Sequence, residues 1–452
     1  MALSANTVFE IRTGGADTNG AGFVTGASGT DHSLQDAAQY SVTDAVTAGT
    51  TTITSVTANF GTDVVGNILY IEGGTGAIVA AWYEIISRTN STTIVVDRST
   101  GLSVGTGATL KIGGALASPG GLGAALASAS TSGMKAWIKS GTYTLTSSTA
   151  NVAGGKFSGP SNKPIRIEGY TTTRGDGGVP IISCGAIGTI TVFTVAIAGD
   201  IQTVASLRYL KVDANGQSSI TAFAVSGQTT RIEDCYALSC STGFLITSNA
   251  DIVRSFAESC TTGISVNSAN AFMCRTKSCT TGFSQLTTGV VAHCLATGGT
   301  TGFSSNSNSY CRAINCVAYG ASGSGYATWY MGWATNCYAE NCGAYGFNMP
   351  RSSIQNCGGY NNTSGNVNAS NVVYNDGFVT LSGSAFVDAA GDDFRPNATA
   401  SAGALLRAAG IGVYGQTDNR DIGAVQHADP VGATGFVVRR RKRYIPDQEH
   451  FY

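Results

Sequence analysis

Residues 337–347 read CYAENCGAYGF, which places two cysteines five positions apart, ahead of a glycine and an aromatic residue. Closely similar strings occur upstream, CYALSCSTGF at 235–244 and CRTKSCTTGF at 274–283. Cys337 and Cys342 therefore belong to a series. A metal site, a set of disulfides, a catalytic thiol and a repeated structural position are the four interpretations of this series.

The series has a period of about twenty residues, measured here from the numbering. Its first cysteine position is occupied by Cys235, Ser255, Cys274, Cys294, Cys316, Cys337 and Cys357. Its second is occupied by Cys240, Cys260, Cys279, Gly299 and Cys342. A unit this short, with β-type segments and no room for a helix, predicts a solenoid in which each repeat is one coil of strands.

Both cysteine positions face the interior only if the chain turns between them, because residues five apart in one strand point to opposite faces. Stacked coils then form an internal column in which Cys acts as a compact apolar residue. Stacked geometry and a reducing cytoplasm disfavour disulfides. Zinc sites prefer CxxC spacing. We therefore favour a structural column over a disulfide, metal or reactive-thiol role, with the members Cys235, Cys240, Cys260, Cys274, Cys279, Cys294, Cys316, Cys337, Cys342 and Cys357.

The position before the first cysteine becomes asparagine in the last three repeats, as Asn315, Asn336 and Asn356. Asparagine tolerates a bent backbone and hydrogen-bonds to stacked copies of itself. We predict an asparagine ladder at a turn. His293, which holds this position in an earlier repeat, is interpreted as a turn residue.

Composition points to many short strands joined by turns, since the 452 residues include 60 glycines and 12% charged residues. A net charge of −1 argues against a nucleic-acid binder with a global positive field. One local basic run, Arg439, Arg440, Arg441, Lys442 and Arg443, is either a docking tail or a solvated end. We expect synthesis in a host cytoplasm without a signal peptide, and no contact with a membrane.

Several segments resemble the right-handed parallel β-helix, or pectate-lyase-like, superfamily, in the versions found in bacteriophage virion proteins and tailspikes. Ser118 and Pro119 before GGLGAALASAS resemble the start of the helix that closes the first coil. KAWIKSGTYTL (135–145) and KPIRIEGYTTTRGDGG (163–178) resemble early coils, and DNRDIGAVQH (418–427) resembles a closing strand. We expect an all-β, single-stranded, right-handed parallel β-helix with a short N-terminal cap helix.

Four parts are expected along the chain. Residues 1–40 would hold an N-terminal segment and the first strand, and residues 41–115 a small β-rich insertion of four strands in hairpins. The β-helix would span 116–428, and the basic tail 429–452.

Catalytic residues, metals and cofactors are not predicted. Glycoside cleavage usually needs two carboxylates on one site. By register, Glu233 and Asp234 fall on the coil next to that of Glu258, but Glu258 lies three positions after the first cysteine position and need not share a face with Asp234. The carboxylates of the repeat region are Glu233, Asp234, Asp251, Glu258 and Glu340. Asp234 and Arg254 are interpreted as an exposed ion pair of small energetic value.

Tyr326, Trp329, Tyr330 and Trp333 form an aromatic cluster within YATWYMGWATNCY (326–338). They could contact a sugar or a protein, while strand alternation could turn half of them inward. The resemblance implies a virion surface structural protein, as capsid decoration or a short fibre, which forms a homotrimer and contacts other virion proteins such as the major capsid protein. The alternative is a tailspike-like receptor-binding protein or polysaccharide depolymerase with a host glycan as partner.

Overall fold

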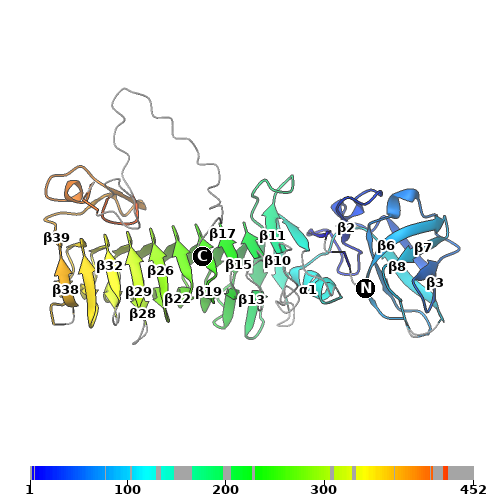
Figure 1. Cartoon of the computed structure of the whole chain (residues 1–452), viewed down its shortest axis with the longest axis horizontal. Helices are drawn as coiled ribbons and strands as arrows, with labels where there is room; N and C mark the ends of the chain where they lie inside the picture. The colour runs from blue at the N-terminus through cyan, green and yellow to red at the C-terminus, as the bar shows by residue number, and fades with distance from the viewer. Residues whose placement is uncertain are drawn as a thin grey trace, which may run out of the picture.

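The structure is a computed structural model that describes residues 3–4, 6–76, 78–101, 104–128, 134–146, 165–196, 205–226, 230–305, 310–327, 332–370, 372–407, 409–410 and 421–425. The described chain is a rod (Figure 1), with a small barrel at the N-terminal end and a long stack of coils extending away from it. Three sheets run along the stack, and nearly all of their strand pairs are parallel. The predicted parallel β-helix is therefore confirmed.

The thirteen-stranded sheet has one antiparallel pair, β1 with β2, at its N-terminal edge. Its strands, in spatial order, are β2 (Gly22–Val24), β1 (Thr7–Ile11), β9 (Lys135–Lys139), β11 (Ile165–Tyr170), β14 (Ala205–Arg208), β17 (Arg231–Glu233), β20 (Asp251–Val253), β23 (Asn270–Phe272), β26 (Gly289–Ala292), β29 (Cys311–Ile314), β32 (Trp333–Thr335), β35 (Ser352–Gln355) and β38 (Val372–Asp376).

The other two solenoid sheets have eleven and nine strands. The eleven-stranded sheet contains β10 (Thr142–Leu145), β12 (Ile181–Cys184), β15 (Lys211–Asp213), β18 (Tyr236–Leu238), β21 (Phe256–Glu258), β24 (Arg275–Lys277), β27 (Leu295–Thr297), β30 (Val317–Tyr319), β33 (Tyr338–Glu340), β36 (Gly358–Tyr360) and β39 (Val379–Thr380). The nine-stranded sheet contains β13 (Ile190–Ala196), β16 (Ile220–Ser226), β19 (Thr242–Thr247), β22 (Thr262–Asn267), β25 (Thr281–Gln285), β28 (Thr301–Ser305), β31 (Tyr326–Ala327), β34 (Tyr345–Asn348) and β37 (Gly365–Val367).

In most coils, two corners are made by single residues in the left-handed backbone region. In one coil these are Asp234, with φ 55°, and Ser239, with φ 56°. The first corner is also occupied by Tyr209, Arg254, Met273, His293, Asn315, Asn336, Asn356 and Gly377, and the second by Ser259, Ser278, Gly298, Gly320, Asn341 and Asn361. Asparagine and glycine visit this region most readily, which explains why they recur at the corners.

Each corner residue directly precedes a cysteine position, so the chain bends between the two cysteines and turns both inward. All twelve cysteines are free and buried, including Cys184 and Cys311, which lie outside the predicted column. Their thiols contact backbone carbonyls of their own or the preceding coil, for example Cys316 Sγ with Val291 O at 3.3 Å. In this structure the cysteines fill the narrow core.

The glycine of the repeat lies where coils approach closely. A Cβ on Gly243 would lie 2.5 Å from the carbonyl oxygen of Gly263 in the next coil. The residue that follows enters a stacked apolar column, in which ring centroids lie 4.6–5.4 Å apart in the pairs Phe193–Phe223, Phe223–Phe244, Phe283–Phe303, Phe303–Tyr326 and Tyr326–Phe347. The rings therefore stack along the rod axis at distances close to the ~4.8 Å spacing of neighbouring strands.

The predicted cap helix is α1 (Pro119–Ser128). Ser118 Oγ accepts a hydrogen bond from the Gly121 amide at 3.0 Å, as expected for an N-cap residue. The strings that follow form strands β9, β10 and β11, as the resemblance implied.

The N-terminal insertion is a closed six-stranded barrel and not four strands in hairpins. Its strands are β3 (Tyr40–Ala48), β4 (Thr52–Thr54), β5 (Ile68–Glu72), β6 (Ala81–Asn90), β7 (Thr93–Val96) and β8 (Val104–Ile112), and two short 3-10 turns lie at His32–Leu34 and Thr62–Val64. Strands β3 and β8 were not predicted because Thr, Ser and Gly obscure the alternation of apolar and polar residues in them. Trp82 Nε1 donates to Asn19 O at 2.9 Å, which ties the barrel to the N-terminal segment.

The C-terminal segment, residues 381–407 with 421–425, packs against the eleven-stranded sheet. It contains β40 (Phe386–Asp388), β41 (Asp393–Pro396) and a 3-10 turn at Gly403–Leu405. Its apolar cluster joins Phe386 and Phe394 to Val317 and Tyr338 of the sheet. The expected closing strand at 418–427 is wrong for the part that is described, since 421–425 contains no strand and 422–425 forms bends.

Candidate functional site

Charged side chains gather on the outer face of the thirteen-stranded sheet. Strand register aligns Glu10, Trp137, Glu168, Arg208 and Glu233 across successive strands. Their neighbours along the strands, such as Ile167, Leu207 and Ile232, are buried in the core. Because side chains alternate along a strand, the charged set belongs to the outer face.

Arginines engage the carboxylates of this face. Arg208 Nε lies 3.0 Å from Glu233 Oε2, and Arg231 Nη2 lies 3.4 Å from Glu233 Oε1. Arg254 contacts both Glu233 and Asp234, the latter at 2.8 Å, and this hydrogen bonding raises the pKa of Arg254. Arg166 pairs with Glu168, which is 1% exposed. The predicted Asp234–Arg254 pair is thus part of a larger ladder.

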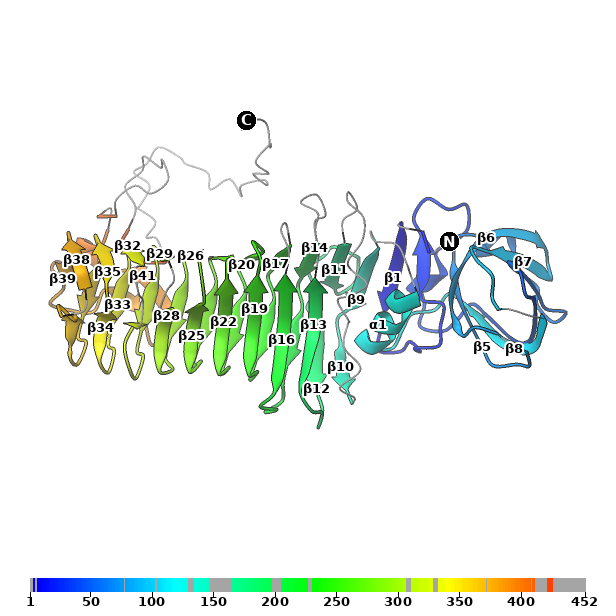
Figure 2. The same cartoon turned by 60° about the horizontal axis from the view of Figure 1, so that its bottom comes forward.

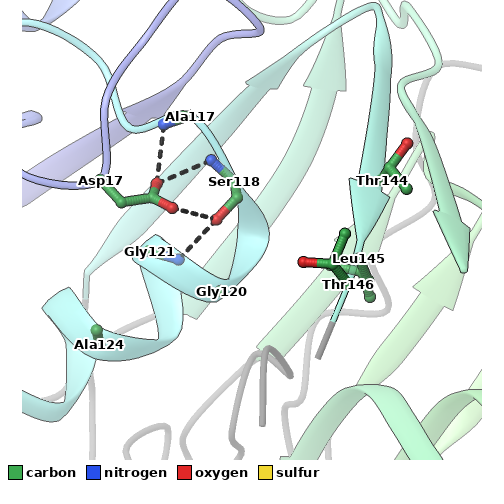
Figure 3. Close-up of a pocket in the computed structure, with 9 residues that line it drawn as sticks. All are labelled: Asp17, Ala117, Ser118, Gly120, Gly121, Ala124, Thr144, Leu145 and Thr146. Atoms are coloured by element: carbon green, nitrogen blue, oxygen red, sulfur yellow. Dashed lines mark hydrogen bonds between the residues drawn. The ribbon is translucent and has the colours of Figure 1, made fainter. Parts of the chain in front are cut away.

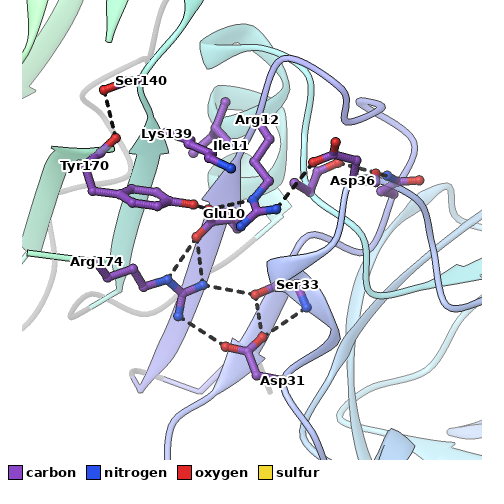
Figure 4. A network of polar contacts seen from close by, with 12 residues as sticks. Glu10, Ile11, Arg12, Asp31, Ser33, Asp36, Lys139, Ser140, Tyr170 and Arg174 are labelled. Atoms are coloured by element: carbon purple, nitrogen blue, oxygen red, sulfur yellow. Dashed lines mark hydrogen bonds and ion pairs between the residues drawn. The ribbon is translucent and has the colours of Figure 1, made fainter. Parts of the chain in front are cut away.

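Glu10 is the centre of a second network, at the start of the same face (Figure 4). Its buried carboxylate accepts hydrogen bonds from Tyr170, from Arg174 Nε at 2.9 Å and from Arg12 Nε at 3.2 Å. Arg174 also reaches Asp31 at 3.1 Å. These contacts connect β1 and the N-terminal segment to the loop after β11, although these parts lie far apart in sequence. We call this network, centred on Glu10, the clasp.

Asp251 lies beside Arg231 in the register of this face, but no ion pair found among the described residues includes it. Asn270 Nδ2 donates to Asp251 Oδ1 at 3.0 Å. Burial raises the pKa of Asp251, partly opposed by the Asn270 hydrogen bond and the charge of Arg231. A carboxyl of this kind could donate a proton, but general acid catalysis of glycoside cleavage needs a second, available carboxylate, and Glu233 is held by three arginines.

An exposed aromatic cluster lies farther along the face. Tyr310 and Trp333 are 53% and 42% exposed. Their ring centroids lie 6.3 Å apart with planes 22° from parallel. The Arg312 guanidinium lies 5.6 Å from the Trp333 ring centroid. The following strand places Ser353 beside Trp333. The serine side chain is too small to cover the face of the indole ring that it adjoins.

The predicted aromatic patch is only partly correct. Trp333 is exposed, but Tyr326 is fully buried between Phe303 and Phe347 in the core, because its position is the stacked apolar column. Trp329 and Tyr330 lie outside the described residues. Tyr310 was missed, although the pairing of Arg312 with Trp333 across adjacent strands brings its segment alongside.

The remaining predicted residues have structural surroundings. Burial raises the pKa of the Cys235 thiol to about 12 and that of Cys342 to about 11, which suppresses thiolate chemistry. In the asparagine ladder, Asn356 hydrogen-bonds to Asn336 at 2.8 Å. Among the described residues no group of three or more His, Cys, Asp or Glu side chains could hold a metal, and no helix is long and apolar enough to span a membrane. The basic run 439–443 lies outside the described residues.

A pocket of about 600 Å³ lies between α1 and β10 (Figure 3). Among the described lining residues, the charged one is Asp17. Its Oδ1 accepts from the amides of Ala117 and Ser118 at 2.9 and 3.0 Å, and its Oδ2 accepts from Ser118 Oγ at 2.6 Å. These contacts hold the start of the cap helix. The Asp17 carboxylate and the Ser118 hydroxyl are therefore used to build the fold.

Comparison with solved structures bears on the fold of this chain. No protein-family model and no curated protein match the chain. Among solved structures, it is similar to pectate lyase Pel9A, with 17% identity and a TM-score of 0.51 over 68% of this chain and 90% of that one. A rhamnogalacturonan lyase has 13% identity and a TM-score of 0.45 over 59% and 83%. ORF18 of Geobacillus virus E2 has 13% identity and a TM-score of 0.40 over 57% of each chain. The chain therefore shares the β-helix fold of pectate lyase Pel9A.

Proposed function

We propose that the chain is a non-enzymatic surface protein of a phage-type virion that binds host polysaccharide along the outer face of the thirteen-stranded sheet. The observation that carries this proposal is the exposed pair Tyr310 and Trp333 beside Arg312. Apolar faces of sugar rings stack on aromatic rings, and a guanidinium adds hydrogen-bond donors for hydroxyl or carboxylate oxygens.

The setting favours recognition of an extended polymer. Trp333 and Arg312 lie on paired strands of a rigid parallel sheet. The Trp333 ring and the Arg312 guanidinium are therefore positioned by strands and not by loops. The sheet continues on both sides of the cluster, with Val290 beside Arg312 and Ser353 beside Trp333. A linear chain lying along the rod could therefore contact several coils.

The ion pairs of the same face support binding without cleavage. Glu233 and Asp234 accept from arginines, and Glu10 and Glu168 are buried against them. Cleavage by the usual two-carboxylate route requires one group to hold a proton and the other to be available to water or to the sugar. Carboxylates held by guanidiniums are poorly suited to either role.

Two assays on the full chain test this proposal together. Capsular polysaccharide and lipopolysaccharide from candidate host strains are titrated into the protein by calorimetry, and the same mixtures are assayed for new reducing ends and for unsaturated products. We expect saturable binding to at least one polymer with neither product. New reducing ends or unsaturated products would establish the depolymerase alternative. Lack of binding to every polymer would contradict the glycan proposal.

A purely structural role, as capsid decoration or a short fibre, is the second candidate. It is favoured by the rod shape, in which the barrel forms one end and the coils extend away from it (Figure 1). Labelled antibody against the purified chain, imaged on intact particles by electron microscopy, would show whether it projects from a particle surface.

A further inference from the structure

The outer face of the nine-stranded sheet carries a ladder of threonines. Strand register aligns one threonine from each of six successive strands, namely Thr191, Thr221, Thr242, Thr262, Thr281 and Thr301. Each is partly exposed. Figure 2 shows this sheet facing the viewer, with β16, β19, β22, β25 and β28 side by side as a broad surface.

A second column of small or neutral side chains runs beside the threonines. It is formed by Thr194, Ala224, Leu245, Ser265, Ser284 and Ser304, again in register. None of the nine strands contains a charged residue or a histidine. The face is therefore an uncharged surface of methyl and hydroxyl groups with little relief.

The other two faces of the solenoid differ. The thirteen-stranded sheet carries the arginine–carboxylate ladder. The eleven-stranded sheet carries Lys211, Arg275 and Lys277, and the C-terminal segment covers part of it through Phe386 and Phe394. Within the described chain, the nine-stranded sheet is the solenoid face that combines neutrality with the absence of a packed segment.

We propose that copies of this chain pack against one another through the nine-stranded sheet. A β-sheet repeats every ~4.8 Å across its strands, and a second copy of the same face has the same repeat. Rows of threonine methyls can therefore interdigitate along the whole ladder, as between sheets that pack face to face. A partner without this periodicity would match only a few rows.

The area and the charge of the nine-stranded face are both compatible with a second copy of the chain as its partner. Nine strands at ~4.8 Å spacing and about five residues of ~3.3 Å each give a face on the order of 700 Å². This value is near the ~800 Å² that each partner contributes to a standard interface. Neutral faces bring no charge that must be desolvated without a counterion. This inference does not depend on the proposed glycan ligand.

The test uses the full chain and charges placed in the middle of the ladder. Sedimentation velocity at micromolar concentrations is expected to show the parent protein as a multimer. The double variant Thr262→Lys, Thr281→Lys should associate at least tenfold more weakly. The matched control is Thr335→Lys, which changes a partly exposed threonine on the thirteen-stranded sheet and should leave the parent mass unchanged. A monomeric parent, or a double variant with the parent's mass, would overturn the proposal.

A spin label gives a second readout that does not require disrupting the face. The native cysteines are buried, so a thiol-reactive label will modify Thr262→Cys at the introduced thiol. Dipolar coupling between labels on different copies is expected for Thr262→Cys and not for Thr335→Cys. Equal absence of coupling in both variants would also overturn the proposal.

Discussion

Asn356 donates a hydrogen bond from Nδ2 to Oδ1 of Asn336, the equivalent residue one coil earlier, at 2.8 Å. Its Nδ2 also donates to Ala409 O at 2.7 Å. Both asparagines have left-handed backbone, with φ 49° and 54°. The two asparagines therefore suit the left-handed corner of the coil, and their hydrogen bond connects successive coils. Asn356 also holds Ala409, which lies beyond the solenoid.

Replacement of Asn356 separates these roles. Asn356→Ala should destabilise the solenoid by about 3–4 kcal/mol, because alanine disfavours the left-handed region by about 1–2 kcal/mol and each of the two lost hydrogen bonds contributes about 1 kcal/mol. Asn356→Gly keeps the backbone freedom and should cost about 2 kcal/mol from the two lost bonds. The denaturant midpoints of the two variants give the order, and equal midpoints would contradict the role of backbone conformation.

The clasp at Glu10 should be the most sensitive polar contact at the N-terminal end. Glu10→Gln keeps the shape but removes the charge that pairs with Arg12 and Arg174. Breaking a buried pair costs about 3–5 kcal/mol, and we expect about 3 kcal/mol because Asp31 and Asp36 retain part of the pairing. Hydrogen exchange of the β1 amides should accelerate.

Asp36→Asn is the matched control for this variant. Asp36 is 56% exposed and lies 3.5 Å from Arg12. An exposed pair contributes less than about 1 kcal/mol, so β1 exchange should change little. If the control accelerated exchange as much as Glu10→Gln, the buried carboxylate would not be the centre of the clasp.

Glu340 should make docking of the C-terminal segment depend on pH. Its carboxyl accepts from Tyr338 Oη at 2.9 Å and from the Ala385 amide at 3.1 Å. Burial raises the pKa of Glu340 above its ordinary value of 4.5. The neutral form is therefore favoured in the docked state, so docking is strongest below that value and weakens as pH rises through the raised pKa.

Hydrogen exchange at the Ala385 amide, corrected for the intrinsic pH dependence of exchange, measures this effect. Protection should fall as pH rises through the raised pKa in the parent protein. Glu340→Gln should show protection without that step. A step of the same size in the variant would assign it to another group.

The cysteines should be inert in the folded protein. All twelve are free and buried, and burial raises thiol pKa values such as that of Cys235, to about 12. An aromatic disulfide reagent should therefore label none of them in native protein and all of them after denaturation. Rapid labelling of native protein, or bound zinc, would contradict the core-column interpretation.

The repeat region could be predicted because each coil presents the same requirements. Cys337 follows a left-handed corner and Gly346 lies against the next coil, so residue type and period together identify the solenoid. A ring at the position of Tyr326 is required by the stacked core, and for that reason its assignment to a surface patch was wrong.

Contacts that occur once in the molecule could not be predicted from the repeat period of the sequence. Arg174 reaches Glu10 across 164 positions. The loop that carries it is longer than the corresponding links between the same two sheets in the other described coils. Tyr310 meets Trp333 through pairing of adjacent coils whose register varies with the length of each turn. The packing of Phe386 on Tyr338 likewise depends on a segment outside the repeat.

Trp333→Ala tests the central claim that the exposed aromatic pair is the glycan contact. A ring contact contributes about 0.5–1.5 kcal/mol, which corresponds to roughly a two- to tenfold change in Kd. The control is Val387→Ala, a change at a 52% exposed apolar residue of the C-terminal segment. Calorimetric titration with the polysaccharide that binds the parent should show weaker binding for Trp333→Ala and parental binding for the control. Unchanged affinity of Trp333→Ala would contradict the account.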